Sequence, residues 1–322
     1  MRKIGKVINE YFVLRKSFTP AIARNKLFEK FWGRIGNYKI FNNIASDFYQ
    51  YKHETIINFL EKDFNQFLKS YNFKEVSHKE IEQRKIFSMW IQGYESAPKL
   101  VQKTIDSQRK YAEKYGYKFV FLDKNNIQEY VTLPSEIVEK YENGIIDFTR
   151  YSDIVRVALL SKYGGIWLDS TIYVDSSQEL DYLKKEFYTI RAKANEGVPK
   201  YVANGRWSSF CLSGEKQSVV FDFLEKFHVA YFMKYDIVLD YFLLDYIIEL
   251  GYRTNDLIRN YIDRVEENNQ ELFFLADNFS NQYDEKEWAG VLSTTALFKC
   301  SYKCPINEAT GTYFDRLVKG EL

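Results

Sequence analysis

Apolar and polar positions divide the chain into a helical first part and an alternating second part. Apolar residues recur at helical spacing over 55–71, which predicts a helix with one buried face. The segment 77–84 is polar and has the character of a linker. We therefore place a domain boundary near residue 85, with a helical N-terminal region over 1–85.

The remainder, 86–322, alternates between short apolar runs and longer helical patterns. This alternation favours a mainly parallel sheet covered by helices. Strands are expected at 86–91, 118–122, 166–168, 188–192 and 207–212, and helices at 98–115, 134–141, 147–163 and, in two runs, 219–250.

The segment 148–174 carries the most specific pattern of the chain. Its apolar stripe over 152–163 predicts a buried helix. Gly164 and Gly165 follow the last turn, where a left-handed backbone is easiest for glycine. The dense strand after them ends at Asp169, at the edge where open α/β sheets bind their ligands.

Three charged side chains of this segment are candidates for a ligand site. Asp153 and Arg156 are three residues apart and share a helix face, and Asp169 follows the strand. Each has an ordinary alternative, because Asp153 could cap a helix, Arg156 could pair with it and Asp169 could begin a turn. Together they favour a site, since charges beside an apolar helix are costly to bury unless they are paired or hold a ligand.

Composition fits a globular enzyme. The chain has 322 residues, 46% of them apolar, and no apolar run approaches the roughly 18 residues of a membrane span. Polar residues interrupt the first sixteen positions, so we expect no secretory signal and a cytoplasmic protein. Cys211, Cys300 and Cys304 are an odd set without zinc-site spacing, and we expect reduced thiols.

Charge is unevenly distributed. Residues 1–52 contain eleven Lys or Arg and three Asp or Glu, a balance of +8, so the rest of the chain carries −7 of the net +1. Aromatic residues interleave with these cations, as in segments that lie on an anionic membrane surface. The alternative is a solvated helical hairpin packed against the second domain. Nucleic-acid binding is not expected, because neither a known motif nor a basic overall balance is present.

The segment SDIVRVALLSKYGGIWLDST is similar to the core of glycosyltransferases with a DXD sugar-binding motif, and most closely to the capsular polysaccharide synthesis proteins. The segment FSMWIQG at 87–93 resembles the first strand of that family. The resemblance covers about 86–175 well. It implies that 86–322 is a GT-A-like nucleotide-sugar-binding catalytic domain, with a Rossmann-type mixed α/β sheet covered by helices.

The resemblance also implies roles for individual residues. Trp90 would lie near the nucleobase, with Gln92 and Gly93 beside it. Asp153 and Arg156 would contact the donor sugar and ribose.

Asp169 matches the first carboxylate of the metal motif, whereas Thr171 stands where the broader family has a second Asp. Mn²⁺ or Mg²⁺ would then be held by Asp169, Thr171 and the donor diphosphate, with a neutral hydroxyl as a weak ligand.

Further candidates lie downstream. Asp240 and Asp245 belong to a stretch that is similar to one in the family. Five residues apart on an α-helix, their side chains would point about 140° away from each other. We select Asp245 as the catalytic candidate of the two. Lys299 and Lys303 match a terminal family pattern, and Lys299 would neutralise phosphate charge. The loop near 197–205 and the hydroxyls of Ser208 and Ser209 are candidates for the acceptor mouth.

The function implied is transfer of a hexosyl group from a nucleoside diphosphate sugar, expected to be a UDP-sugar, to a hydroxyl of a capsular or cell-surface glycan. The acceptor would be a glycan or a lipid-linked oligosaccharide, the anomeric configuration would be retained, and the protein would act on the inner face of a bacterial membrane. Two alternatives remain: a catalytically inactive glycan-binding or scaffold protein, favoured by Thr171, and a membrane-surface interaction module.

Overall fold

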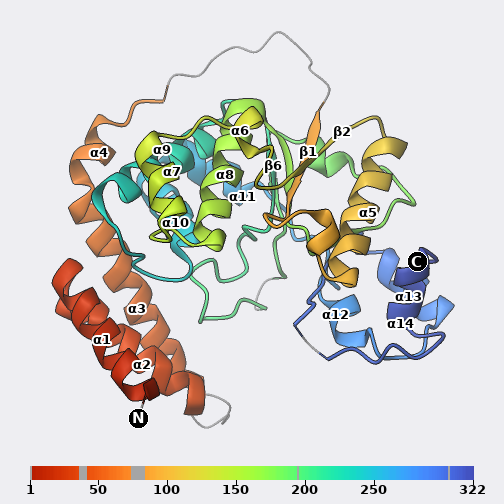
Figure 1. Ribbon diagram of the computed structural model, residues 1–322, viewed down its shortest axis with the longest axis horizontal. Helices are drawn as coiled ribbons and strands as arrows, with labels where there is room; N and C mark the ends of the chain where they lie inside the picture. The colour runs from red at the N-terminus through yellow and green to blue at the C-terminus, as the bar shows by residue number, and fades with distance from the viewer. Residues whose placement is uncertain (1, 36–41, 74–83, 194–195, 304) are drawn as a thin grey trace.

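The computed structural model describes residues 2–35, 42–73, 84–193, 196–303 and 305–322. Four helices come first: α1 (Arg2–Ser17), α2 (Pro20–Ile35), α3 (Asn42–Asp63) and α4 (Asn65–Ser70). The first two pack side by side, and α3 contacts α2 and the later helix α10 (Leu243–Thr254) (Figure 1). The expected helix at 55–71 is therefore the end of α3 followed by α4, and most of the expected linker at 77–84 lies outside the described residues.

The central sheet has five strands in the order β2 (Lys118–Leu122), β1 (Lys85–Met89), β3 (Gly165–Leu168), β6 (Cys211–Gly214) and β5 (Phe187–Thr189). Strand β1 runs parallel to β2 and β3, whereas β6 runs antiparallel to β3 and β5. The sheet therefore contains both parallel and antiparallel pairs, and the fold is of the α/β class, as expected. The strands expected at 188–192 and 207–212 are displaced, and 190–192 and 207–210 are irregular backbone beside a cavity.

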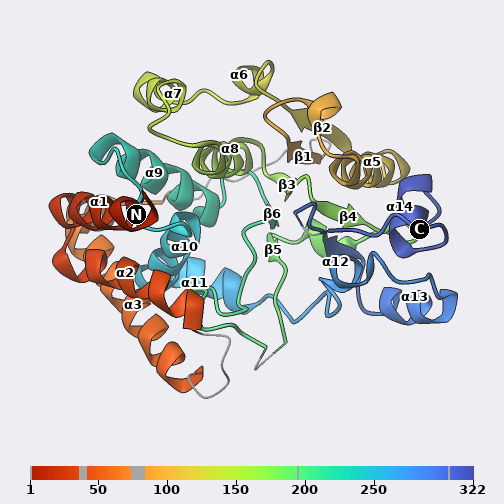
Figure 2. The same cartoon turned by 60° about the horizontal axis from the view of Figure 1, so that its bottom comes forward.

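Helices cover both faces of this sheet (Figure 2). On one side lie α8 (Phe148–Tyr163), α9 (Val219–Lys234), α10 and α11 (Asp256–Asp263). The other side carries α5 (Lys99–Lys114), α12 (Phe274–Asn278), α14 (Tyr313–Lys319) and a small sheet of β4 (Ile172–Val174) and β7 (Leu297–Lys299). The remaining helices are α6 (Ile127–Tyr130), α7 (Ser135–Glu142) and α13 (Glu285–Leu292), with short 3₁₀ turns at Tyr94–Ser96 and Asp181–Lys184.

Two glycines make the corner between α8 and β3. Gly164 and Gly165 have φ of 63° and 89°, which disfavour any residue with a Cβ. A Cβ on Gly164 would lie 2.4 Å from the Lys216 nitrogen, and one on Gly165 would lie 2.5 Å from the Lys85 oxygen. The corner thus needs glycine for its backbone angles and for two close approaches, that of the segment after β6 to Gly164 and that of β1 to Gly165. It sets the position of Asp169.

Three apolar clusters hold the described layers, and the smallest of them consists of Ala97, Val101 and Ile105. The largest includes the sheet, α8 and α9, and it also takes in Ile56, Ile57 and Leu60 of α3. The second lies under the C-terminal helices around Trp288, Phe298 and other aromatic residues. Within the described residues, no helix is both long enough and apolar enough to cross a membrane. Cys211 and Cys300 are buried free thiols, and Cys304 lies outside the described part of the chain.

Candidate active site

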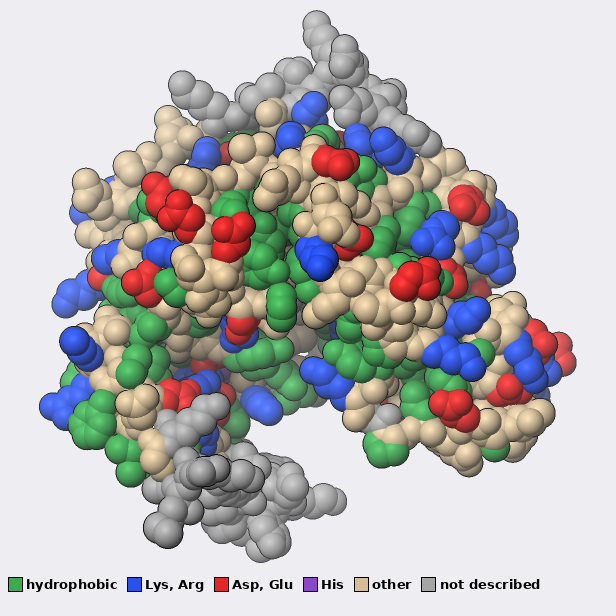
Figure 3. All heavy atoms as spheres, viewed as in Figure 1, with side chains coloured by type: hydrophobic (Ala, Val, Ile, Leu, Met, Phe, Trp, Pro, Cys, Tyr) green, Lys and Arg blue, Asp and Glu red, His purple; other side chains and the backbone are tan. Residues whose placement is uncertain are grey.

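A cavity of about 560 Å³ opens beside the carboxyl end of β3. The space-filling view shows the molecule hollowed between the N-terminal helices and the C-terminal helices, with basic and apolar side chains at the border (Figure 3). The cavity wall includes the candidates Asp153, Arg156, Asp169 and Asp245, and several aromatic rings. A concave, largely apolar site with a few converging polar groups is the usual form of a ligand site.

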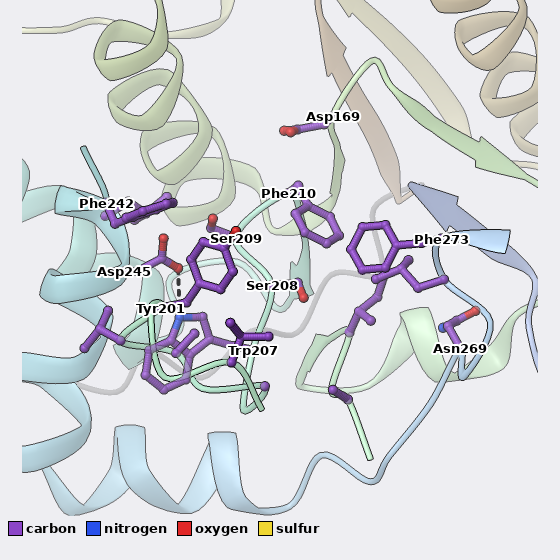
Figure 4. Close-up of a pocket in the computed structure, with 18 of the residues that line it drawn as sticks. Asp169, Tyr201, Trp207, Ser208, Ser209, Phe210, Phe242, Asp245, Asn269 and Phe273 are labelled. Carbon is purple, nitrogen blue, oxygen red and sulfur yellow. Dashed lines mark hydrogen bonds between the residues drawn. The ribbon is translucent and has the colours of Figure 1, made fainter. Parts of the chain in front are cut away.

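The turn after β3 fixes Asp169 at the edge of this cavity. The Asp169 amide donates to the Phe210 carbonyl at 2.9 Å, and the Asp169 carbonyl accepts from the Ile172 amide at 2.9 Å. The same carbonyl accepts a hydrogen bond from the side-chain amide of Gln108 on α5, also at 2.9 Å. With its backbone held from three elements, Asp169 lines the cavity and lies at its border, above Phe210 in the view of Figure 4.

The Asp169 carboxylate lies between two cations. Arg156 Nη2 is 3.0 Å from Oδ1, and Lys299 Nζ is 2.9 Å from Oδ2. The Trp167 indole N–H also donates to Oδ1 at 3.0 Å. Burial alone would raise the pKa of Asp169, but Lys299 and Arg156 outweigh it and hold the pKa below its usual value. Asp169 is therefore ionised at neutral pH.

Arg156 connects the helix α8 to both sides of the cavity. Besides Asp169 it lies 3.4 Å from Asp153 Oδ1, and its Nη1 donates to the Ser209 carbonyl at 2.5 Å. Asp153 and Arg156 thus share a face, as their spacing predicts. Asp153 does not cap the helix, because Asp147 holds that position and accepts from the Arg150 amide at 3.0 Å.

Two further carboxyl groups, those of Asp153 and Asp245, line the cavity, and their pKa values are raised rather than lowered. Burial raises the pKa of Asp153 to about 7, despite the neighbouring Arg156. Burial also raises the pKa of Asp245 to about 6, although the Trp207 indole donates to its Oδ1 at 3.0 Å. Carboxyl groups with such values exchange protons near neutral pH and can donate as well as accept hydrogen bonds to a sugar hydroxyl.

Asp240 lies elsewhere. It precedes α10, so the expected helical angle between Asp240 and Asp245 does not apply. Its carboxylate is buried 2.8 Å from Lys52 Nζ of α3, and it accepts from the Phe242 amide at 3.1 Å. Asp240 therefore joins the N-terminal helices to the segment before α10, and only Asp245 of the two reaches the cavity.

Aromatic side chains form much of the cavity wall and were not selected from the sequence. Tyr201, Trp207 and Phe242 gather around Asp245, whereas Phe210 and Phe273 face each other farther along the cavity (Figure 4). They come from separate segments, and in a chain that is 18% aromatic only their proximity distinguishes them. The expected acceptor loop and Ser208 and Ser209 do line this cavity.

Trp90, Gln92 and Gly93 follow β1 at the same sheet edge as Asp169, but they do not line the cavity. The Trp90 ring packs edge-to-face on Tyr302, with centroids 5.6 Å apart. Lys303 is exposed, and its Nζ lies 5.8 Å from the centre of the Tyr302 ring rather than on the carboxylates. Trp90 therefore packs against the C-terminal segment.

The residues expected to bind Mn²⁺ or Mg²⁺ fit a divalent ion poorly. Such ions need several free oxygen ligands, yet both Asp169 oxygens are bound to cationic side chains and the Thr171 hydroxyl accepts from Lys299 Nζ at 2.8 Å. Among the described residues, no three His, Cys, Asp or Glu side chains cluster as they would around a metal ion.

Comparison with known proteins places this site in context. The family model of the capsular polysaccharide synthesis proteins matches residues 34–317. An uncharacterized glycosyltransferase of Acanthamoeba polyphaga mimivirus is 35% identical over 86 residues, which are 26% of this chain and 33% of that protein. The match thus spans about a third of the relative.

A solved structure of a glycosyltransferase involved in the glycosylation of the major capsid of PBCV-1 is 11% identical. It aligns over 73% of this chain and 98% of its own, with a TM-score of 0.34, which is too low to support an argument.

Proposed function

Because the chain belongs to the capsular polysaccharide synthesis protein family, we propose that it is a glycosyltransferase that moves a hexosyl group from a nucleoside diphosphate sugar to a glycan hydroxyl. The observation that carries this proposal is the Asp169 carboxylate held between Arg156 and Lys299 at the mouth of a sugar-sized cavity. We assign the mixed sheet to the GT-A-like class on the same resemblance, and we take a UDP-sugar as the donor.

The donor would extend from the end of β1 into the cavity. Its base lies by Trp90, Gln92 and Gly93, its diphosphate by Lys299, and its sugar by Asp153 and Arg156. Arg156 and the ionised Asp169 present complementary charge to ring hydroxyls, because charged groups make the stronger hydrogen bonds. The nearly neutral Asp153 adds a group that can donate or accept.

In the transfer step, the acceptor oxygen bonds to the anomeric carbon while the bond from that carbon to the diphosphate oxygen breaks. The electron pair leaves with the diphosphate, and the acceptor proton passes to the departing phosphate oxygen. Attack from the face that the leaving group vacates retains the anomeric configuration and needs no protein nucleophile. Lys299 stabilises the negative charge that develops, and positioning supplies much of the remaining rate enhancement.

The acceptor occupies the aromatic part of the cavity. The rings of Tyr201, Trp207 and Phe242 offer flat apolar surface to a sugar ring, and Asp245 lies among them to bind a hydroxyl. Turnover of a donor panel by the wild type and by Asp169→Asn tests the proposal. Glycan binding without turnover would instead support a catalytically inactive glycan-binding or scaffold protein.

The N-terminal helices carry a surface suited to an anionic membrane. The α1 residues Ile8, Phe12 and Val13 are 50%, 57% and 40% exposed, and Arg15 and Lys16 end the same helix. Exposed apolar side chains beside cations bind the headgroup region of anionic bilayers. We therefore propose peripheral attachment to the inner face of a bacterial membrane, where a lipid-linked acceptor would be presented.

A further inference from the structure

The ammonium of Lys299 occupies the position between the two side chains that the sequence assigns to a metal. Its Nζ lies 2.9 Å from Asp169 Oδ2 and 2.8 Å from Thr171 Oγ1. A single cation therefore joins the first and third positions of the Asp-Ser-Thr motif. A divalent ion bound at this place would have to displace Lys299 first.

The fold fixes this ammonium rather than leaving it on a mobile surface chain. Lys299 is the last residue of β7 and pairs with Ile172 of β4, directly after Thr171. Its amide donates to the Leu272 carbonyl at 2.8 Å, and its Nζ lies 4.6 Å from the centre of the Phe210 ring. Its side chain is only 22% exposed, so little conformational freedom remains to be lost when a ligand binds.

Charge at this place already favours an anion. Arg156 and Lys299 share the carboxylate of Asp169, and Arg156 also lies 3.4 Å from Asp153, whose pKa burial raises to about 7. Because Asp153 is only partly ionised at neutral pH, these four groups together keep a partial positive charge. A divalent cation between Asp169 and Thr171 would lie close to the cationic groups of Lys299 and Arg156, and the one carboxylate that would hold it is already shared by both, which is unfavourable in a poorly solvated site. A diphosphate would instead meet an ammonium that donates two of its three N–H groups to Asp169 and Thr171, so that the third can donate to a phosphate oxygen.

We infer that this chain binds the diphosphate of its donor without a divalent metal, and that the Lys299 ammonium takes the place of that ion. The inference rests on the proposed function, and it gives the Asp-x-Thr motif a defined role, which is to hold the ammonium of Lys299. Thr171 then accepts a hydrogen bond from the ammonium and helps to orient it. As the bond to the anomeric carbon breaks, Lys299 donates a hydrogen bond to the diphosphate oxygen that receives the electron pair, and it keeps its proton.

The first test measures binding rather than turnover. The purified protein is titrated calorimetrically with UDP, GDP and dTDP, once in EDTA and once in Mn²⁺. We expect one nucleotide to bind with the same affinity in both buffers. Binding that requires Mn²⁺ would overturn the inference while leaving the proposed function intact, whereas no binding of any nucleotide in either buffer would overturn both.

Variants then assign the effect to Lys299. Lys299→Met should weaken nucleotide binding in EDTA by about 10–100-fold, the loss of one charge-assisted hydrogen bond to phosphate. The control is Lys286→Met, an exposed lysine on α13, which should bind as the wild type does. Circular dichroism melting of each variant confirms that it is folded.

Removing the ammonium also frees Asp169 Oδ2 and Thr171 Oγ1. Mn²⁺ should therefore improve nucleotide binding to Lys299→Met but not to the wild type, and the Mn²⁺ electron paramagnetic resonance signal should be reduced only by the variant. Wild-type affinity of a folded Lys299→Met variant in EDTA would contradict the inference.

Discussion

At the scale of single residues, carboxyl groups that line the same cavity have different protonation states. Asp169 keeps its charge because Lys299 and Arg156 outweigh the effect of burial, whereas burial dominates at Asp153 and Asp245. One fixed anion and two groups that titrate near neutrality suit a site that must orient a polar donor. The sequence predicted the positions of Asp153, Arg156 and Asp169, because local helix and strand spacing determines them.

The raised pKa of Asp153 makes a pH prediction. The folded protein holds this proton up to about pH 7, whereas in the unfolded chain the carboxyl group has its ordinary pKa of 3.8. The group therefore costs stability progressively as pH rises from about 4 to 7. Asp153→Asn should remove this cost, so its stability relative to the wild type should rise by about 1–4 kcal/mol over that range. Urea unfolding at several pH values measures it, and parallel curves for the two proteins would show that Asp153 titrates normally.

Trp90 tests the placement of the nucleobase. If the base stacks on its ring, Trp90→Ala should cost about 1–3 kcal/mol of nucleotide affinity by calorimetry. The control is Tyr51→Ala, which removes an exposed aromatic ring on α3. Trp288→Ala would not serve, because Trp288 is buried in the C-terminal core. Equal affinities of Trp90→Ala and the wild type would place the base elsewhere.

At the scale of elements, the N-terminal helices are fixed to the wall of the cavity. Lys52 of α3 is 1% exposed and lies 2.7 Å from Glu29 and 2.8 Å from Asp240. The next residue, His53, donates to the Pro199 carbonyl through Nε2 at 2.9 Å and accepts from the Tyr246 hydroxyl through Nδ1 at 2.8 Å. Helix α3 thus contacts both the loop near Pro199 and α10, which carry parts of the cavity wall.

The buried ion pair of Lys52 predicts a large stability effect. Among the residues that the structure describes, Lys52→Met leaves Asp240 with Lys26 as its ion-pair partner, at 3.7 Å, and the change should destabilise the protein by about 3–5 kcal/mol in chemical unfolding. Lys69→Met, at an exposed position on α4, is the matched control and should change little. A Lys52→Met variant as stable as Lys69→Met would show that the pair does not join these elements.

Element contacts also mark the limit of prediction from sequence. The α8–Gly–Gly–β3 corner was predictable because its signals lie within one short segment. Lys299 and Asp169 are 130 positions apart in the sequence, and their contact depends on the pairing of β7 with β4. These two strands are so short that the sequence pattern does not predict which strands pair. We expected Asp240 and Asp245 on one helix, whereas Asp240 lies between α9 and α10. The apolar pattern over 219–250 does not show where α9 ends and α10 begins.

At the scale of the whole molecule, helix α1 lies at the end opposite the C-terminal helices (Figure 1), and its side chains Ile8, Phe12 and Val13 are exposed. Phe12→Asp should reduce co-sedimentation with vesicles containing phosphatidylglycerol, and higher salt should weaken binding of the wild type. The control is Leu257→Asp, which changes an exposed apolar residue on α11 and should leave vesicle binding unchanged. Tyr241 is also exposed, but it lines the cavity and is therefore not used. Equal sedimentation of the wild type with neutral and anionic vesicles would contradict an electrostatic membrane contact.

The central claim is that this chain transfers a sugar from a nucleotide donor, and turnover of a donor panel tests it most directly. Purified wild type, Asp169→Asn and the exposed control Asp181→Asn are incubated with UDP-, GDP- and CMP-sugars and a glycan acceptor, in EDTA and in Mn²⁺. We predict nucleoside diphosphate release and acceptor glycosylation from one UDP-sugar, reduced at least about 10²-fold by Asp169→Asn and unchanged by Asp181→Asn. Absence of turnover with every donor, or full activity of a folded Asp169→Asn variant, would contradict the account.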